Sequence, residues 1–464
     1  MRADLAGRRR GQRDVLVGAW LHRPPGGRPP GRLRPGRHLH VEGGAVRRVR
    51  SWRVISWRVI AEGAGLIHIP RVRDPFHRSQ LAIAALFCSL GFQYATWASR
   101  IPALKADLGL TAAEVGFLLM AAGIGASVSF PLVSVLMRRL GSQRLGLLSA
   151  LGLTLVLIAL AMAPNYPVAL AVVCCDGVLV GCLNVAMNAQ GAALEVRHKR
   201  NAMAKLHATF SGGSLLAALL ASGVNAMTST VAVHFGVAAV VLLLLFGYAR
   251  TGLLAEDEAA EEKRDETKSR SGWSLPTRMT LWMCCAMVFG TVTEGAINDW
   301  SALYMTDVVK ASAQLAPLGI AVVSGMMVLA RLFADGWRAR WGDGRVVVLG
   351  SALAGTGLAL ALLSGGVVPA LIGFSCVGLG IAAVTPCVYV AAAKQGPDAL
   401  ALVAAMGTTG LLAGPPIIGF VANSSSLVWG LGVVAASAAV VSLCGTRVQW
   451  TPPANALGTE VPGR

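Results

Sequence analysis

Several ionisable and amide side chains of this sequence lie inside long apolar segments, where burial in a bilayer would make them costly. The stretch GTVTEGAINDWSALY, residues 290–304, places Glu294 and Asn298 one turn apart on the same face of a helix. Asp299 is rotated by about 140° from Glu294, so the two carboxylates cannot act as a pair. Because buried ionisable groups usually face a cavity, we expect Glu294 and Asn298 to bind a solute or to couple its movement to a proton. A hydrogen bond that fixes this helix to a neighbour is the alternative.

Two further apolar segments carry polar side chains that could line the same cavity. Segment 167–193 contains Asp176 and three amides within seven residues, and amides suit a hydroxyl-bearing solute through paired donor and acceptor bonds. Segment 79–98 ends with Gln93 and Trp97 four residues apart, an arrangement that fits sugar-like ligands. Helix packing is the alternative for the polar residues, and anchoring at the interface is the alternative for Trp97. The predicted substrate and coupling residues are Glu294, Asn298, Asp176, Asn184, Asn188, Gln190, Gln93 and Trp97.

Charged residues closer to the ends of the segments are expected to hold gates. Asp299 lies near the predicted outer interface, beside an aromatic pair. Arg331 and Asp335 are one turn apart and could pair with each other or across an inner gate. Arg100 stands at the predicted outer mouth, where it could hold a gate or attract anions. The predicted gating residues are Arg331, Asp335, Arg100, Asp299 and Arg139.

Other kinds of chemistry find no support in the residue pattern. The nine cysteines form no CxxC and no cluster with histidine at the spacing of metal ligands. There is no Ser/His/Asp or Cys/His arrangement, and no GxxxxGK[ST] that would bind a nucleotide. We therefore expect no enzyme, no metal, no cofactor and no direct drive by ATP.

The elements that must position these residues are apolar helices. Hydrophobic residues make up 55% of the chain and charged residues only 14%, against about 25% in soluble proteins. Apolar runs of about 20 residues, the length that crosses a bilayer as a helix, recur along the chain. The sequence thus predicts an all-α polytopic membrane protein with twelve spans, at 79–98, 112–137, 145–163, 167–193, 205–225, 229–250, 279–304, 313–335, 345–365, 367–392, 400–422 and 426–445.

The chain divides into parts by composition and by an internal repeat. Residues 1–78 hold 18 arginines and 5 acidic residues, which is +13 of the total net charge of +18. This Arg/Gly/Pro-rich arm is expected to be disordered or to reflect a start site assigned too far upstream. Trp97 recurs as Trp300 at an offset of 203, and RRLGSQR at 138–144 recurs as ARWGDGR at an offset of 201. We expect two six-helix halves, with an arm, a charged linker and a tail: 1–78 arm, 79–250 first half, 251–278 linker, 279–446 second half and 447–464 tail.

Basic residues in the short loops predict the orientation. They are concentrated in alternate loops, which predicts that both termini are cytoplasmic. The expected partners are the lipid bilayer, a small-molecule substrate and, as candidate coupling ion, the proton. Because most of the basic excess belongs to the arm, no nucleic acid is expected. A monomer is expected.

Four motifs carry a family resemblance: ATWASRIPALKADLGL (95–110), NVAMNAQGAALE (184–195), EGAINDW (294–300) and GPDALALVAAMGTTGLLAGPPIIGF (396–420). On these, residues 79–446 resemble the major facilitator superfamily, in a bacterial branch of inner-membrane transporters related to the fucose permease type. The resemblance implies two pseudo-symmetric six-helix halves around a central site. Two positions depart from the family pattern: Arg138 stands where an Asp-Arg-x-Gly turn begins with Asp, and Asn184 stands where a membrane carboxylate is usual.

The sequence therefore predicts a secondary active transporter that moves a small polar solute by alternating access, with sugar-like molecules among the candidates and with proton coupling through Glu294 as the first hypothesis. An exporter of amphipathic compounds is the alternative within transport. A membrane sensor or scaffold that does not transport is the alternative of another class, favoured by the missing Asp at position 138.

Overall fold

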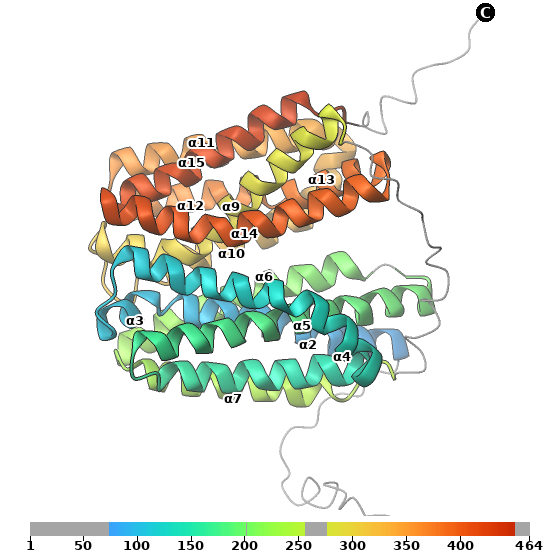
Figure 1. The fold of residues 1–464 in the computed structure, drawn as a ribbon, viewed down its shortest axis with the longest axis horizontal. Coiled ribbons are helices and arrows are strands. Elements are labelled where there is room, and N and C mark those ends of the chain that lie inside the picture. The colour runs from blue at the N-terminus through green and yellow to red at the C-terminus, as the bar shows by residue number, and fades with distance from the viewer. Residues whose placement is uncertain (1–73, 201, 256–275, 451–464) are drawn as a thin grey trace, which may run out of the picture. The chain divides into compact units, whose positions relative to one another are not determined.

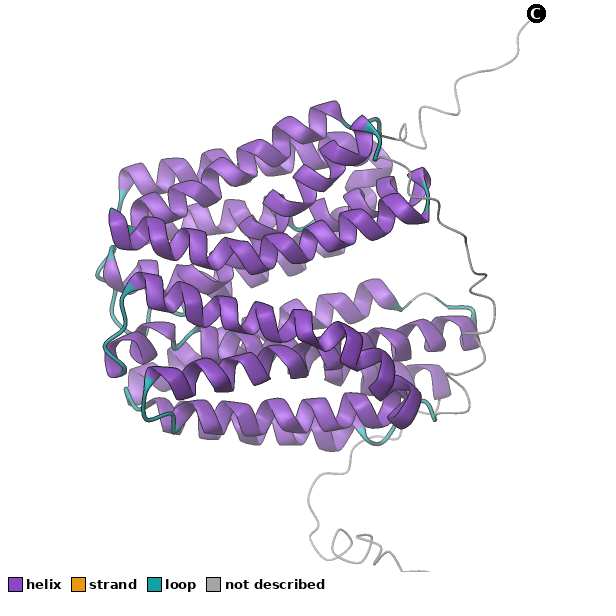
Figure 2. Cartoon of the chain, viewed as in Figure 1, coloured by secondary structure: helices purple, strands orange, loops and turns teal. Residues whose placement is uncertain are grey.

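The structure, a computed structural model, describes residues 74–200, 202–255 and 276–450. All regular elements in these ranges are α-helices, with no strand among them (Figure 2). Ten helical segments in the described ranges are long and apolar enough to cross a bilayer, and a shorter apolar stretch of helix covers residues 318–334. The predicted all-helical membrane class is thus confirmed, whereas the count of twelve spans stays a prediction. The predictions for residues 1–73, for most of the linker and for residues 451–464 lie outside the described residues.

The described helices belong to one compact unit, in which we distinguish two bundles (Figure 1). The helices up to residue 249 pack mostly on one another, as do those from residue 278 onward. The first bundle contains α2 (Pro75–Ala98), α3 (Ile101–Asp107), α4 (Ala112–Ala161), α5 (Tyr166–His198), α6 (Met203–Met227) and α7 (Val231–Ala249). The second contains α9 (Arg278–Asp307), α10 (Leu318–Trp341), α11 (Asp343–Ser364), α12 (Val367–Ile381), α13 (Val384–Gln395), α14 (Pro397–Ser424) and α15 (Leu427–Arg447).

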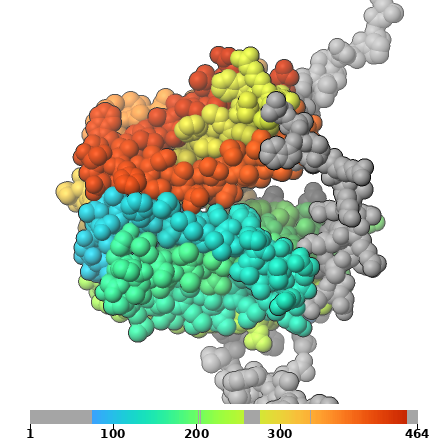
Figure 3. All heavy atoms as spheres, viewed as in Figure 1, coloured from blue at the N-terminus to red at the C-terminus, as the bar shows by residue number. Residues whose placement is uncertain are grey.

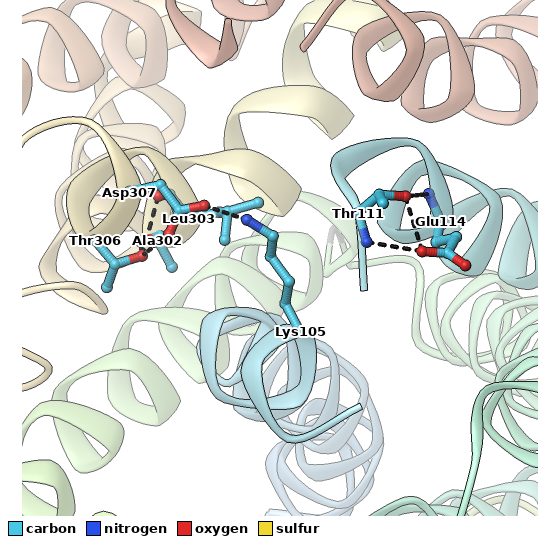
Figure 4. Close-up of polar contacts among 7 residues, drawn as sticks. All are labelled: Lys105, Thr111, Glu114, Ala302, Leu303, Thr306 and Asp307. Atoms are coloured by element: carbon cyan, nitrogen blue, oxygen red, sulfur yellow. Dashed lines mark hydrogen bonds and ion pairs between the residues drawn. The ribbon is translucent and has the colours of Figure 1, made fainter. Parts of the chain in front are cut away.

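Local sequence explains where several helices begin. Asp74 caps α2 by accepting a hydrogen bond from the backbone N–H of Phe76 at 2.9 Å. The hydrogen bond from the His77 ring and the bond from Phe76 hold the pKa of Asp74 below its usual value. Thr111 and Glu114 form a capping box at the start of α4, in which each side chain accepts the other residue's backbone N–H (Figure 4).

Two of the long helical segments contain an interruption. α4 contains two helices joined at a kink at Gly141, with φ of 71°, and this kink falls between the spans expected at 112–137 and 145–163. Glycine adopts this left-handed conformation without steric cost, so the chain can bend there without a loop. The span expected at 367–392 corresponds to one apolar segment, Val367–Gln395, in which Ala382 and Ala383 separate α12 from α13.

The bundles contact each other mainly through α4 with α14 and α6 with α10, with smaller contacts of α9 to α2 and α3. The contact of α4 with α14 depends on glycine. A Cβ atom on Gly116 would lie 3.0 Å from the carbonyl oxygen of Pro415 and 3.2 Å from the Cα of Gly419. Only glycine lets the two backbones approach this closely, as in other small-residue contacts between membrane helices. This contact lies near the start of α4, at what we call the α3 end of the bundles.

Candidate functional site

An ion pair of the second bundle lies where this bundle contacts the first. Its two residues, and the residue of the first bundle that it contacts, are all near the middle of their helices. The guanidinium Nη2 of Arg331 on α10 lies 3.2 Å from Oε1 of Glu294 on α9. The Nη1 of the same guanidinium donates a hydrogen bond to the hydroxyl of Ser211, which belongs to α6 of the first bundle. The side chains of Arg331 and Glu294 are 25% and 29% exposed, so solvent or a solute can reach both charges. A charged pair at this depth that is bonded across the bundle interface is suited to respond to a ligand or to a proton.

Asn298 lies one turn beyond Glu294 on α9 and is half-buried. Its Nδ2 donates to the backbone carbonyl of Glu294 at 2.8 Å. The amide is thus turned toward its own helix, and no side-chain bond joins it to the carboxylate of Glu294 in the described structure. Its side-chain oxygen accepts no hydrogen bond from the residues that the structure describes.

A second polar group lies toward the α3 end, where α2 meets both α5 and α9. Tyr94 donates its hydroxyl proton to Oδ1 of Asp299 at 2.5 Å, which joins the two bundles. The adjacent residue, Gln93, donates from Nε2 to Oδ1 of Asp176 at 2.7 Å, within the first bundle. Asp176 and Asp299 are both buried. The Oε1 atom of Gln93 is buried and has no hydrogen-bond partner among the described residues.

Beyond this group, polar contacts join the bundles at their α3 end. Lys105 on α3 forms an ion pair with Asp307, the last residue of α9 (Figure 4). Ser222 donates to the carbonyl oxygen of Gln314 at 2.6 Å, and Asn225 donates to that of Ala313 at 2.8 Å. These three contacts, with the glycine contact of α4 and α14, close the bundles against each other at this end.

Toward the opposite end, the two bundles separate. Figure 3 shows the second bundle in contact with the first on the left, where α3 lies in Figure 1, and a hollow between them toward the right. Arg331 lies on this side of the closed contacts, since α10 runs from the α3 end toward the opposite end. The described part of the structure is therefore closed at the α3 end and open at the other.

Several predicted site residues lie elsewhere. Gln190 is fully buried, donates to the Ser142 hydroxyl at 2.8 Å and exchanges two hydrogen bonds with the backbone of Leu254. It thus joins α5 to the chain that follows α7. Asn188 donates to the side-chain oxygen of Asn184 at 2.7 Å, and neither amide is bonded to the ion pair.

Four predicted residues remain: Arg100, Trp97, Arg139 and Asp335. Arg100 is buried, with Nε 3.1 Å from the Nδ1 of His234 and Nη1 bonded to the Ser229 carbonyl, so it holds α7 rather than a contact between bundles. Trp97 is 3% exposed and lies edge-on to Tyr94, and its indole N–H lacks a described partner. Arg139 is exposed near the bend of α4. Asp335 follows Arg331 by one turn of α10, and its side chain lies outside what the structure describes.

The structure also shows contacts between helices that involve residues not predicted from the sequence as site residues. Ser211, Lys105 and Asp307 all make contacts between helices that are far apart in the chain. Tyr94 stands next to a predicted site residue in the sequence, but nothing in its spacing points to its bond with Asp299. No spacing rule relates these pairs, because each is separated by more than 100 residues. No group of three or more His, Cys, Asp or Glu side chains that could hold a metal occurs in the described residues.

Comparison with known proteins identifies the family. The family model of the Major Facilitator Superfamily matches residues 15–202 and 81–399. The chain belongs to this superfamily. It is 32% identical over 372 residues to an uncharacterized transporter of the superfamily type from Yersinia pestis, a match that covers 78% of this chain and 94% of that protein. It is 30% identical to the membrane protein MosC of Rhizobium meliloti, over 77% of this chain and 89% of MosC.

Several solved transporter structures share the fold. A D-xylose-proton symporter superimposes with a TM-score of 0.64 at 14% identity, over 82% of this chain and 99% of the symporter. The nucleoside transporter NupG gives 0.62 at 13% identity, over 81% of this chain and 98% of NupG. FucP in its outward conformation gives 0.52 at 17% identity, over 79% of this chain and 99% of FucP. The family model and the Yersinia pestis relative confirm the predicted superfamily, and the protein is a multi-pass membrane transporter.

Proposed function

We propose that this member of the superfamily is a secondary active transporter that moves a small polar solute across the bacterial cytoplasmic membrane by alternating access. The observation that carries the proposal is the partly exposed pair of Arg331 and Glu294, bonded to Ser211 across the bundle interface. A solute that binds here would contact both bundles at once, which is what a transporter that rocks its halves around a central site requires.

The chemistry of the site favours a solute with several hydroxyl groups. Arg331 offers guanidinium donors, Glu294 offers carboxylate acceptors, and Asn298 offers an amide oxygen one turn away. Neighbouring hydroxyls on one molecule can replace the Ser211 bond and part of the ion pair without leaving either charge unpaired. The symporter for D-xylose and the nucleoside transporter, whose solutes both carry several hydroxyl groups, have the same fold and support this choice.

Glu294 is the proposed coupling residue. With Glu294 ionised, its charge is balanced by Arg331, and the guanidinium is held between α9, α10 and α6. A proton on the carboxylate would remove that attraction and release the guanidinium to the solute or to Ser211 alone. Protonation and solute binding would therefore act on the same guanidinium, which links them energetically.

We further propose that the α3 end faces the outside, as the loop charges predict, so that the described conformation is closed to the outside and open to the cytoplasm. To open outward, the chain must break the Lys105–Asp307 ion pair and the Tyr94–Asp299 hydrogen bond. Both contacts join the bundles, so they would form in only one of the two orientations. This fits the gating role that the sequence predicts for Asp299.

The test uses purified protein in liposomes. A thermal-shift screen of sugars, nucleosides and organic acids first identifies a stabilising solute, and its uptake is then followed under an imposed pH gradient. We expect Glu294→Gln to lose gradient-driven accumulation but to keep exchange of labelled for unlabelled solute, because exchange needs no net proton movement. Asp398→Asn is the matched control, since Asp398 is an exposed carboxylate at the start of α14. Equal accumulation by wild type and Glu294→Gln would remove Glu294 from coupling.

A further inference from the structure

An apolar groove lies on the second bundle, between α10, α11 and α12, away from the central site. It has a volume of about 290 Å³. Its walls include Trp337, Trp341, Leu349, Leu353 and Leu379, and the one charged residue that lines it is Arg345. Leu349 and Leu353 are 63% and 41% exposed. An apolar groove of this kind on membrane helices can hold an acyl chain. A charged residue at its edge can favour lipids whose headgroup has the opposite charge.

One wall of the groove continues as a ladder of aromatic rings on α10. Phe333, Trp337 and Trp341 are spaced by four residues and stack on one another. The ring centroids are 6.0 Å apart for the first pair and 6.3 Å apart for the second, with nearly parallel planes. Trp341 ends the helix at the opposite end from α3 and is 43% exposed. Tryptophan at a helix end is typical of the level at which lipid headgroups lie.

The same corner carries an excess of positive charge. Arg340 and Arg345 are exposed, and neither has a hydrogen-bond or ion-pair partner among the described residues. The nearby Arg338 is instead bonded to Asp343, with Nε to Oδ1 at 2.8 Å. The charge of Asp343 is thus neutralised by Arg338, and it does not offset the charges of Arg340 and Arg345.

We propose that this groove binds an anionic phospholipid, with an acyl chain along the apolar walls and the phosphate of the headgroup at Arg345 and Arg340. Three features together carry the proposal: an apolar groove on the helix surface, an aromatic ladder that ends at headgroup level, and Arg345 in the lining of the groove with the exposed Arg340 next to Trp341 in the chain. A free anion would use the arginines but not the groove. A zwitterionic lipid would use the groove but gain less from the arginines. The proposal is independent of the transported solute.

The experiment compares lipids that share acyl chains and differ in headgroup. The full-length protein in detergent is titrated with phosphatidylglycerol or phosphatidylcholine, and binding is followed by native mass spectrometry and by thermal unfolding. Glycerol phosphate, which lacks acyl chains, is the arm that reports on the anion alone. We expect phosphatidylglycerol to bind more tightly than phosphatidylcholine, and glycerol phosphate not to stabilise the protein.

Variants locate the lipid. Arg345→Gln and Arg340→Gln should each weaken phosphatidylglycerol binding about fivefold, since one arginine near an anionic surface contributes roughly that factor, and should leave phosphatidylcholine unchanged. Arg345→Lys retains the positive charge and should retain the preference for phosphatidylglycerol. It therefore provides a second test if Arg345→Gln does not fold. Trp341→Leu should weaken both lipids. Arg278→Gln is the matched control, because it removes an exposed arginine from the start of α9. Equal binding of the two lipids to wild type, or equal loss in Arg278→Gln and Arg345→Gln, would overturn the proposal.

Discussion

The ion pair between Arg331 and Glu294 should contribute measurably to stability, and the contribution can be worked from its geometry. At the observed separation of 3.2 Å, two unit charges attract by about 5 kcal/mol at an effective dielectric constant of roughly 20. Desolvation offsets much of this, although both side chains keep about a quarter of their surface exposed. The pair therefore lies between an exposed pair and a fully buried pair, and we expect a net coupling of about 1–2 kcal/mol.

The single variants should differ in cost. Glu294→Gln removes the charge but leaves an oxygen that can still accept from the guanidinium. Arg331→Gln removes the bonds to both Glu294 and Ser211 and leaves a carboxylate without a cation, so it should destabilise more. The double variant, Arg331→Gln with Glu294→Gln, should be more stable than the sum of the single losses predicts, because it leaves no lone charge.

The assay is a double-mutant cycle of the free energy of unfolding, measured by titrating the protein from mild detergent into SDS. A third variant, Ser211→Ala, reports the part of the Arg331 loss that belongs to the contact with α6. A coupling below about 0.5 kcal/mol, the usual scatter of independent sites, would refute the reasoning. The two charges would then be solvated separately and the observed contact would carry no energy.

Three other residues lead to further predictions. Lys105→Gln removes the partly exposed ion pair to Asp307 and should cost about 0.5 kcal/mol, which shifts the equilibrium between closed and open conformations about twofold toward opening at the α3 end. Spin-label distances across that end measure the shift, and unchanged distances would count against a gating role. Tyr94→Phe leaves buried Asp299 without its donor and should lower the free energy of unfolding by about 1–3 kcal/mol, so an unaltered titration midpoint would show the bond to be dispensable. Gln190→Leu leaves the buried N–H and C=O of Leu254 unpaired and should lower the free energy of unfolding by about 1–3 kcal/mol. Uptake per folded molecule should stay at the wild-type level. A loss of uptake without a loss of stability would instead indicate that Gln190 contacts the substrate.

Sequence reasoning predicts the fold class well because hydropathy reports directly on each helix. It is less informative about partners. For Arg331 the sequence offers Asp335 on the same helix or an unnamed partner across a gate, and it names neither Glu294 nor Ser211, to which the structure bonds it. These contacts depend on how helices pack, and packing is decided by surfaces that no local pattern describes.

The candidate amides illustrate the same limit. Asn184 and Asn188 are four residues apart, and their hydrogen bond follows from that spacing. Gln190 belongs to the same short segment, yet it points into the packing between α4, α5 and the chain after α7. A polar stripe on a membrane helix therefore identifies residues that need partners, but not whether the partner is a solute or the protein itself.

The backbone contact between Gly116 and Gly419 affects how far the two bundles can move relative to each other during alternating access. Gly419 lies 22 residues from Pro397, the first residue of α14, which is a lever of about 33 Å along a helix. If α4 and α14 tilt about this contact by about 10°, the far end of α14 moves by about 6 Å, which follows from the helix rise alone. A pivot made of bare backbone has no side chain to compress, so a small rotation at one face of the membrane becomes a wide aperture at the other.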